Sequence, residues 1–144
     1  MFRVHQFNKV ELFVFCEPGT SGDEHDRLLA IEEEIVGALG LPYRVVNVAA
    51  GDLGAPAVKK YDIEAWFPHQ QRYREVTSTS NTTDYQARRL AIRYRPEDQK
   101  GTEVVHTLNG TAVTDRFVLA VLENFLGEVP DVLKPLGAPE KILR

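Results

Sequence analysis

The sequence predicts an α+β fold, in which an antiparallel β-sheet is flanked by helices. Several short segments alternate their side chains with the two-residue period of strands, and two longer segments repeat apolar residues every three or four positions, as helices do. No internal repeat or flexible linker separates them. The 144 residues are 43% hydrophobic and 26% charged, an ordinary globular composition that is sufficient for one core. One domain is therefore predicted.

The first regular element is predicted to be a strand. From Val10 to Phe15 the side chains alternate between two partly apolar faces. The single cysteine, Cys16, ends this apolar run, where a small buried thiol is expected and no disulfide can form within the chain. Turn residues follow, and Ser21 or Asp23 is expected to cap the next helix.

A helix is predicted from about Glu24 to Leu39, and Gly40 is expected to end it. Its buried stripe repeats at three- and four-residue steps and consists of Leu28, Ile31, Ile35 and Leu39. The acidic triplet Glu32, Glu33 and Glu34 is expected to face largely outward into solvent.

Three further strands are predicted at residues 44–48, 61–67 and 72–79, as antiparallel neighbours. In the second strand, Ile63, Ala65 and Phe67 share one face. In the third, simple alternation places Glu75 with Thr77 on one face and Val76 with Ser78 on the other.

The remaining third of the chain is predicted to contain a loop, a strand and two helices. The serine- and threonine-rich stretch from Thr77 to Asp84 reads as a loop, with Thr82 or Thr83 capping a helix that continues through Arg93. A strand over residues 103–108 is expected to lead into an Asn109-Gly110 turn. The last major helix is predicted over residues 114–126, with its buried stripe made of Phe117, Val118, Val121, Leu122 and Phe125.

Charge and hydropathy exclude some functions. The formal net charge of −4 gives no basic footprint that would by itself suggest a polyanion partner, so the charge is silent about RNA. No DNA partner is expected. The start of the chain lacks the cationic and apolar pattern of a signal peptide, and no apolar run approaches the ~18 residues of a membrane span. No membrane association is expected, and the cytoplasm is the predicted compartment.

The opening run from Phe2 to Glu11 carries the first candidate site residues. Arg3, Phe7 and Glu11 share one face if the segment is a strand, or a strand entered from a loop. Arginine suits phosphate, a phenylalanine ring suits a purine, and a carboxylate suits an ammonium group. The alternation alone is equally typical of a purely structural strand.

Other stretches of the chain accompany this run in a recognisable order. They are Arg72-Tyr73-Arg74-Glu75-Val76-Thr77-Ser78, Thr83-Asp84-Tyr85-Gln86-Ala87-Arg88-Arg89 and His106-Thr107-Leu108-Asn109-Gly110-Thr111, with Arg116 shortly after, and the linking stretches at residues 39–46, 51–57 and 61–66. In this order they resemble the second half of the catalytic domain of seryl-tRNA synthetase, a class II aminoacyl-tRNA synthetase. The resemblance covers nearly the whole chain, and implies that residues 1–144 form part of such a domain.

The resemblance implies an ATP site. Arg3 matches the arginine that reaches the terminal phosphates, Phe7 the ring that stacks on adenine, and Arg116 an arginine that contacts the phosphates from the last helix. Arg3 and Arg116 are thus the implied catalytic cations. Read without the family, Arg116 would form a surface ion pair with Asp115 or Glu123.

The stretch from Glu75 to Ser78 is implied to bind ATP and a metal. Glu75, Val76, Thr77 and Ser78 match ATP-binding positions of the family. The carboxylate of Glu75 and the hydroxyl of Ser78 are hard oxygen ligands that suit Mg2+ bridging phosphates. Without the family, Glu75 reads as a strand glutamate that pairs with Arg74 or Arg72.

The resemblance also implies a serine pocket. Glu11 matches the acid that receives the ammonium or hydroxyl group of serine, Thr111 matches a residue that meets the serine side chain, and Asn109 lies beside it. A pocket that hydrogen-bonds a hydroxyl discriminates against alanine, because its polar groups would otherwise be buried unpaired.

This chain also departs from the family pattern. The spacing from Thr111 to Arg116 is one residue shorter than the common form, and Thr79 and Thr82 stand where many members have cysteines. The family's tRNA-binding arm, its first signature motif and the strand with the α-phosphate arginine have no counterpart in these residues. We therefore expect the isolated chain to be inactive, whether it is a truncated product or part of a longer sequence.

The function that the resemblance implies is that of the C-terminal catalytic part of a serine–tRNA ligase. Such an enzyme uses ATP and Mg2+ to activate L-serine as seryl-adenylate, transfers serine to tRNA(Ser), and acts as a homodimer. Two alternatives remain open from the sequence. One is a noncatalytic, nucleotide-binding paralogue, and the other is an amino acid ligase that charges a carrier protein.

Overall fold

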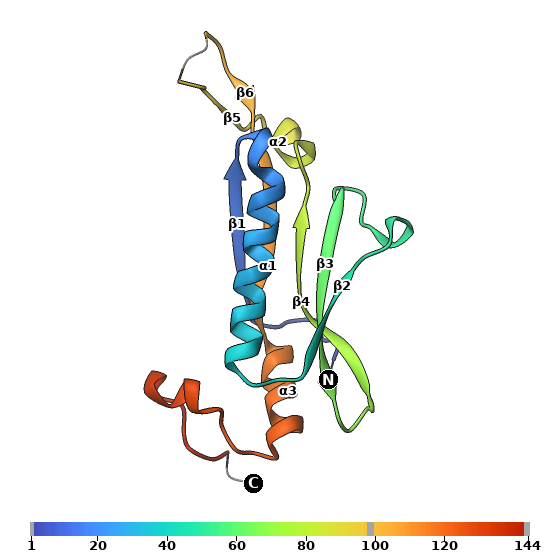
Figure 1. Cartoon of the computed structure of the whole chain (residues 1–144), viewed down its shortest axis with the longest axis vertical. Helices are drawn as coiled ribbons and strands as arrows, with labels where there is room; N and C mark the ends of the chain where they lie inside the picture. The colour runs from blue at the N-terminus through green and yellow to red at the C-terminus, as the bar shows by residue number, and fades with distance from the viewer. Residues whose placement is uncertain (1, 98–99, 143–144) are drawn as a thin grey trace.

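The computed structural model describes residues 2–97 and 100–142 and confirms the predicted α+β fold. Five antiparallel strands form one sheet in the order β1-β7-β4-β3-β2, and a separate two-stranded ribbon joins β5 to β6. The long helix α1 lies against the sheet over β7 and β4, and α3 lies at one end (Figure 1).

The element bounds follow the sequence with some shifts. The strands are β1 Lys9–Cys16, β2 Tyr43–Asn47, β3 Lys59–Phe67, β4 Arg72–Asn81, β5 Arg93–Tyr94, β6 Glu103–Val104 and β7 His106–Thr114. The helices are α1 Ser21–Ala38, α2 Tyr85–Leu90 and α3 Asp115–Phe125, with 3-10 turns at Pro18–Thr20, Ala50–Asp52 and Asp131–Leu136. The predicted neighbours β2, β3 and β4 pair antiparallel, as expected.

The strand β1 forms one edge of the sheet and is entered from a loop. Residues 2–8 have no regular structure, so Arg3 and Phe7 belong to this loop and only Glu11 lies on the strand. Asn8 fixes the end of the loop, because its backbone N–H donates to Asp115 over 3.1 Å.

The predicted serine- and threonine-rich loop is wrong. Its first five residues belong to β4, since their hydroxyl groups find partners across the sheet: Thr79 donates to the carbonyl of Asn109 over 3.2 Å. The helix that follows is also shorter than predicted. It ends at Leu90, because Ala91 adopts a left-handed conformation, and its N-cap is Asp84.

The predicted Asn109-Gly110 turn is wrong as well, although this dipeptide is a common hairpin turn. Strand β7 continues through both residues to Thr114. The reason for glycine here is close packing, since a Cβ atom at position 110 would lie 2.7 Å from Oε1 of Glu32 on α1. Glycine serves as a point of close approach between helix and strand.

Helix α1 starts three residues earlier than predicted and buries polar residues. Its buried positions are Ser21, His25, Leu28, Glu32 and Val36. The expectation that the acidic triplet faces outward is therefore wrong for Glu32, which is 0% exposed. No side chain caps its first turn, contrary to the prediction for Ser21 or Asp23, and Thr20 is the N-cap. Gly40 ends the helix with a positive φ of 69°, as expected.

The hydrophobic core lies between the end of α1, strand β3 and helix α3. The predicted face of Ile63, Ala65 and Phe67 is buried, and so are Phe117 and Val121 of α3. The apolar stripe of α3 is narrower than predicted, because Val118 is 54% exposed and Leu122 is also exposed. Among residues 2–97 and 100–142, no helix has the length and apolar character needed to cross a membrane.

Candidate functional site

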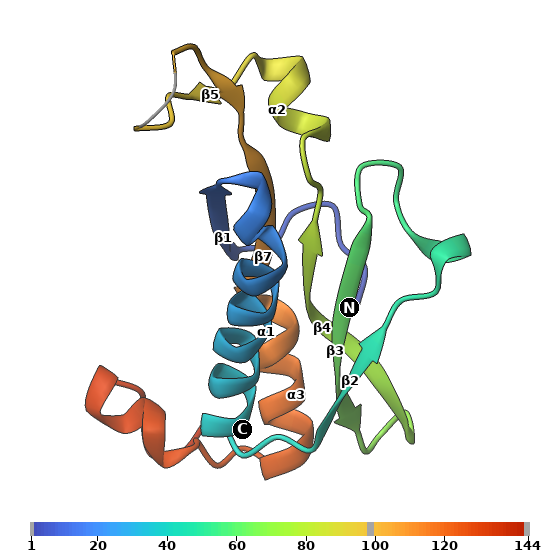
Figure 2. The same ribbon diagram turned by 45° about the horizontal axis from the view of Figure 1, so that its top comes forward.

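A cleft of about 500 Å3 lies where the entry loop, β4, β7 and α3 meet. The described residues that line it include none from α1, which packs on the other face of the sheet. Figure 2 shows both sides of the sheet: α1 lies in front of it, and the N-terminal loop passes behind β4. The lining residues are Phe2, Arg3, Val4, Phe7, Lys9, Glu75, Val76, Thr77, Ser78, Thr111, Thr114, Asp115, Arg116 and Leu119.

A β-bulge in β4 places Glu75 and Ser78 on the same side. Ile63 of β3 pairs with Thr77 and the next residue, Glu64, pairs with Glu75, so Val76 is an extra residue in β4. The side chains of Val76 and Thr77 are both buried, at 1% and 2% exposure, while Glu75 and Ser78 line the cleft. The predicted alternation, with Glu75 beside Thr77 and Ser78 beside Val76, is therefore wrong.

The strands β4 and β7 separate beside this bulge. They pair from Asn81 and Leu108 only as far as Thr79 and Gly110. Beyond that point side chains bridge the gap, since the Thr77 hydroxyl donates to the carbonyl of Thr111. The Thr114 hydroxyl likewise donates to the carbonyl of Val76 over 3.3 Å. It also caps α3, because it accepts from the backbone N–H of Arg116 in the first turn of that helix. The cleft opens where the two strands part.

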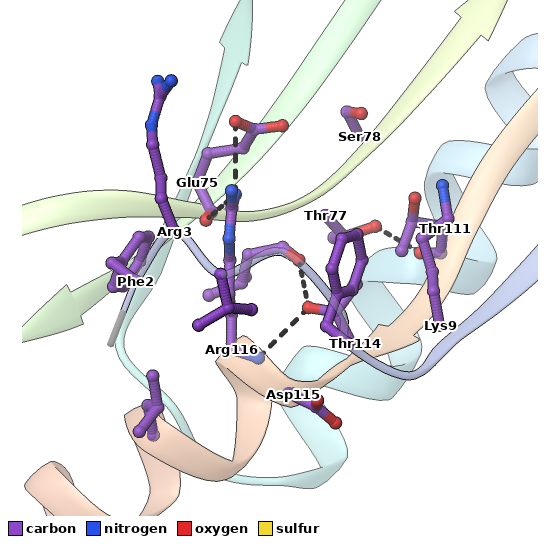
Figure 3. Close-up of a pocket in the computed structure, with 14 residues that line it drawn as sticks. Phe2, Arg3, Lys9, Glu75, Thr77, Ser78, Thr111, Thr114, Asp115 and Arg116 are labelled. Carbon is purple, nitrogen blue, oxygen red and sulfur yellow. Dashed lines mark hydrogen bonds and ion pairs between the residues drawn. The ribbon is translucent and has the colours of Figure 1, made fainter.

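Arg116 reaches across this opening to Glu75. Its guanidinium donates to the backbone carbonyl of Glu75 over 2.9 Å and pairs with the carboxylate at 3.4 Å (Figure 3). The simpler partners expected for Arg116 are engaged elsewhere: Asp115 accepts from the entry loop, and Glu123 accepts from the backbone of His69.

The ring of Phe2 lies close to two guanidinium groups, a feature that the sequence analysis missed. Arg74 lies 4.1 Å and Arg116 lies 5.0 Å from its centroid, and Phe67 packs edge-on at 5.1 Å. Arg74 thus stacks on Phe2 and bonds Gln70 instead of pairing with Glu75. These partners are distant from Phe2 in the sequence, so no local residue spacing could predict the contacts.

Three predicted residues meet at the other end of the cleft. The Asn109 amide donates to Oε1 of Glu11 and the Thr111 hydroxyl donates to Oε2, each over 3.0 Å. Lys9, which the sequence analysis also missed, pairs with the same carboxylate at 2.7 Å. Thr111 lines the cleft directly, whereas Glu11 and Asn109 lie next to the lining through these bonds. Glu11 is half-buried, and the ammonium group of Lys9 compensates its negative charge.

The entry loop supplies the exposed part of the site. Arg3 and Phe7 both line the cleft, and Phe7 is 53% exposed, so part of it is accessible to a ligand. Figure 3 shows the Arg3 side chain extending past Glu75 on the same side as Ser78. The structure thus places Arg3, Phe7, Glu75, Ser78, Thr111 and Arg116 around one cavity.

The arrangement suits a polyanion with an aromatic end. Two guanidinium groups can neutralise phosphates, and a free ring face can stack on a base. Within the part of the chain that the structure describes, no group of three or more acidic, histidine or cysteine side chains could hold a metal. Glu75 and Ser78 offer two oxygen ligands, so a Mg2+ ion at this site would take its other ligands from phosphates and water.

Such a sheet, with cations and oxygen ligands gathered at the opening between two strands, defines a core of the class II tRNA synthetase type. The chain belongs to this family, because the family described as tRNA synthetase class II core domain (G, H, P, S and T) matches residues 1–125. Within it, the chain resembles the serine enzymes. It is 54% identical to the serine–tRNA ligase of Rubrobacter xylanophilus, over 99% of this chain, and 56% identical to that of Thermoplasma volcanium, over 94% of this chain.

Solved structures agree with this placement. The seryl-tRNA synthetase of Pyrococcus horikoshii complexed with ATP matches 99% of the chain with a TM-score of 0.91 and 46% identity. The cytoplasmic serine–tRNA ligase of Naegleria fowleri in complex with AMP matches 98% with a TM-score of 0.88 and 42% identity. The chain spans about a third of these proteins: 35% and 31% of the two ligases, and 34% and 35% of the two structures.

Proposed function

We propose that this chain is the part of a serine–tRNA ligase catalytic domain that holds ATP and serine. The whole enzyme would activate L-serine with ATP to form seryl-adenylate and would transfer serine to tRNA(Ser). The observation that carries the proposal is the convergence of eight predicted residues, drawn from four separate stretches of the chain, on one cleft. The names of the similar proteins, and the ATP and AMP in two of them, support it.

The phosphate end of the cleft would lie between Arg3 and Arg116. Attack of the serine carboxylate on the α-phosphate of ATP requires positioning and charge neutralisation more than covalent help from the protein. Arg3 and Arg116 would act as the catalytic cations on the phosphates, and the exposed ring of Phe7 would stack on adenine.

The Glu75–Ser78 segment would contact ATP and a metal ion. Because Val76 and Thr77 are buried, their backbone groups and not their side chains would face the nucleotide. Glu75 and Ser78, which the bulge turns to the same side, would supply two oxygen ligands to a Mg2+ ion. When bound, this ion would neutralise charge that develops on the phosphate oxygens.

The serine end would lie at Glu11. Its carboxylate would receive the serine ammonium group, and the Thr111 hydroxyl and Asn109 amide, which already bond that carboxylate, would orient it. A substrate hydroxyl would find polar partners there that alanine would leave unpaired, which gives the site its discrimination.

The remaining parts of the proposal concern the whole protein. Residues 1–144 would form the second half of a class II catalytic domain, and the enzyme would act as a homodimer with tRNA(Ser) in the cytoplasm, where tRNA is charged. The noncatalytic paralogue and the carrier-protein ligase stay as alternatives, but no observation favours either over the serine–tRNA ligase.

A chimeric enzyme tests the proposal. These 144 residues would replace the matching segment of the Rubrobacter xylanophilus serine–tRNA ligase, to which they align over 148 positions. We expect the chimera to exchange pyrophosphate into ATP with serine as the amino acid, and to charge tRNA(Ser). Threonine and alanine, assayed in parallel, should support little exchange.

The control is the same chimera with Arg116→Ala, which should fold and lose exchange. A chimera that melts like its parent and binds ATP, yet activates no serine, would overturn the proposal. Activity with a different amino acid would overturn the serine assignment alone.

A further inference from the structure

Glu32 is a buried acid that lies directly behind the proposed serine pocket. It projects from α1 onto the face of the sheet opposite the cleft, and it is 0% exposed. Its Oε1 atom would lie 2.7 Å from a Cβ atom at Gly110, so it presses on the backbone of β7 where only glycine leaves room. Neither carboxyl oxygen has a hydrogen-bond partner among the residues that the structure describes.

The surroundings of Glu32 favour a neutral carboxyl group. Burial raises its pKa to about 8, and although the Thr77 hydroxyl and the Thr111 backbone favour the ionised form, Glu11 and Asp62 oppose it. At neutral pH the group therefore carries a proton and no charge. Ionisation would place an unpaired charge between α1 and the sheet, away from water, which is costly.

A short chain of contacts links this group to the cleft. Gly110 stands between Asn109 and Thr111, and each of these residues donates a hydrogen bond to one oxygen of Glu11. Thr77 ties the same segment to β4 through the carbonyl of Thr111. A shift of the backbone at Gly110 would therefore change the spacing of the two donors on Glu11.

We propose that Glu32 is a positioning residue, which supports β7 at Gly110 from the buried side of the sheet and thereby fixes Asn109, Thr111 and Glu11 at the amine-binding end of the cleft. Where it concerns the serine ammonium group, the inference rests on the proposed function. A charge at this position would disturb the packing of α1 on the segment, and with it the donors on the far side of the sheet.

Other charged groups near Glu32 are compensated. Glu11 on β1 pairs with Lys9, and Asp62 on β3 pairs with Lys60, each at 2.7 Å. His25, two turns earlier on the same face of α1, bonds the carbonyl of Thr79 through Nε2, and burial lowers its pKa. Glu11 and Asp62 thus each pair with a cation, whereas Glu32 pairs with none among the described residues.

The first test needs no ligand. The 144-residue chain is titrated from pH 6 to pH 10 by NMR, following the backbone amides of Gly110 and Thr111 and the side-chain amide of Asn109. We expect these signals to move together with a midpoint near the Glu32 pKa of about 8. In Glu32→Gln, which mimics the protonated acid, the transition should vanish while the spectrum at pH 7 is kept.

The matched control is Glu34→Gln, which changes an exposed acid on the same helix and should keep the transition. If Asn109 and Thr111 do not respond in the wild-type chain, or respond equally in Glu32→Gln, the inference is overturned. Because this arm uses no nucleotide, its failure leaves the proposed function untouched.

The second test separates the serine end from the nucleotide end, in the chimera described above. Affinities are measured for AMP and for a non-hydrolysable seryl-adenylate analogue. We expect Glu32→Ala to weaken binding of the analogue by about tenfold, which is the size of one misplaced charge-assisted hydrogen bond. The affinity for AMP should stay unchanged. Glu32→Gln should restore the affinity for the analogue. Equal loss for both ligands would mean a merely structural role and would overturn the inference. Failure of both to bind the unmutated chimera would count against the proposed function.

Discussion

The guanidinium of Arg116 and the carboxylate of Glu75 lie 3.4 Å apart, across 41 residues of sequence. The same guanidinium donates to the backbone carbonyl of Glu75 over 2.9 Å. The guanidinium of Arg116 is therefore held by the Glu75 carboxylate inside the cleft. An incoming phosphate must compete with Glu75 for Arg116, unless a metal ion takes the carboxylate.

This competition predicts the metal dependence of ATP binding. We expect ATP to bind the wild-type chain better with Mg2+ than with a chelator, because the ion would bind Glu75 and free Arg116. In Glu75→Gln the benefit of Mg2+ should shrink, and ATP without metal should bind at least as well as to wild type. Calorimetric titrations with and without Mg2+ measure both. A full Mg2+ benefit in the variant would exclude Glu75 as a metal ligand.

Loss of the Arg116 side chain should weaken ATP binding strongly. We expect Arg116→Ala to cost about 2 kcal/mol, or roughly 30-fold in affinity, because a charge-assisted contact to phosphate is removed. The matched control is Arg27→Ala, since Arg27 lies on α1 and pairs only with the nearby Glu24 among the contacts described. Equal affinities for the two variants would contradict the role of Arg116, and circular dichroism would show that both are folded.

The ring of Phe7 should contribute by stacking on the base. We expect Phe7→Ala to weaken ATP binding by about 1–3 kcal/mol, the range measured for stacking of a base on an aromatic side chain, and to leave inorganic triphosphate binding unchanged. Phe13→Ala is the control, because Phe13 is 67% exposed on β1 and does not line the cleft. A triphosphate affinity that falls together with that of ATP would argue against stacking.

Burial of Glu32 predicts that the folded chain loses stability as pH rises. The pKa is about 8 in the folded state and 4.5 in the unfolded state, so the folded state binds more protons between these values. The free energy of unfolding should therefore fall by up to about 1.4 kcal/mol per pH unit in that window, and level off above it. Denaturant unfolding at pH 5 to 9 measures the slope, which Glu32→Gln should flatten. An unchanged slope in that variant would mean that Glu32 is ionised in the folded state.

Packing between Glu32 and Gly110 predicts a strong coupling of substitutions. Gly110→Ala should destabilise the wild-type chain, because the new Cβ would lie 2.7 Å from Oε1 of Glu32. In a Glu32→Ala background the same change should cost about 1–2 kcal/mol less, since the opposing atom is gone. A double-mutant cycle from unfolding curves gives this difference. Additive effects would show that the helix yields to the new methyl group.

Local patterns predicted the sheet and the long helices well, because Ile63, Ala65 and Phe67 alternate as a half-buried strand should. They failed where a distant partner decides the outcome. Glu32 belongs to an acidic triplet that reads as solvated, yet Gly110, from a strand far along the chain, makes room for it. Likewise, Asn109-Gly110 reads as a turn, but pairing with the distant strands β1 and β4 makes it part of β7.

The predictions for the site also failed where a distant residue decides the outcome. The family resemblance pointed to Glu75 and Ser78, but alternation along an ideal strand separates them, and only the register with β3 reveals the bulge that reunites them. Phe2 was missed because the two arginines against which it packs, Arg74 and Arg116, lie far away in the sequence. Lys9 was missed because its partner, the Glu11 carboxylate, was already assigned to the serine ammonium group.

The unpaired Val76 makes the spacing of this motif as important as its chemistry. A deletion of that single residue would restore a regular ladder with β3 and keep every functional side chain in the sequence. It would not separate the two oxygen ligands, because their partners Glu64 and Asp62 are two residues apart on β3 and share a face. A strand that kept all four residues in a regular ladder would turn the acid and the hydroxyl to opposite sides, so relatives with this spacing need the bulge to chelate an ion with both.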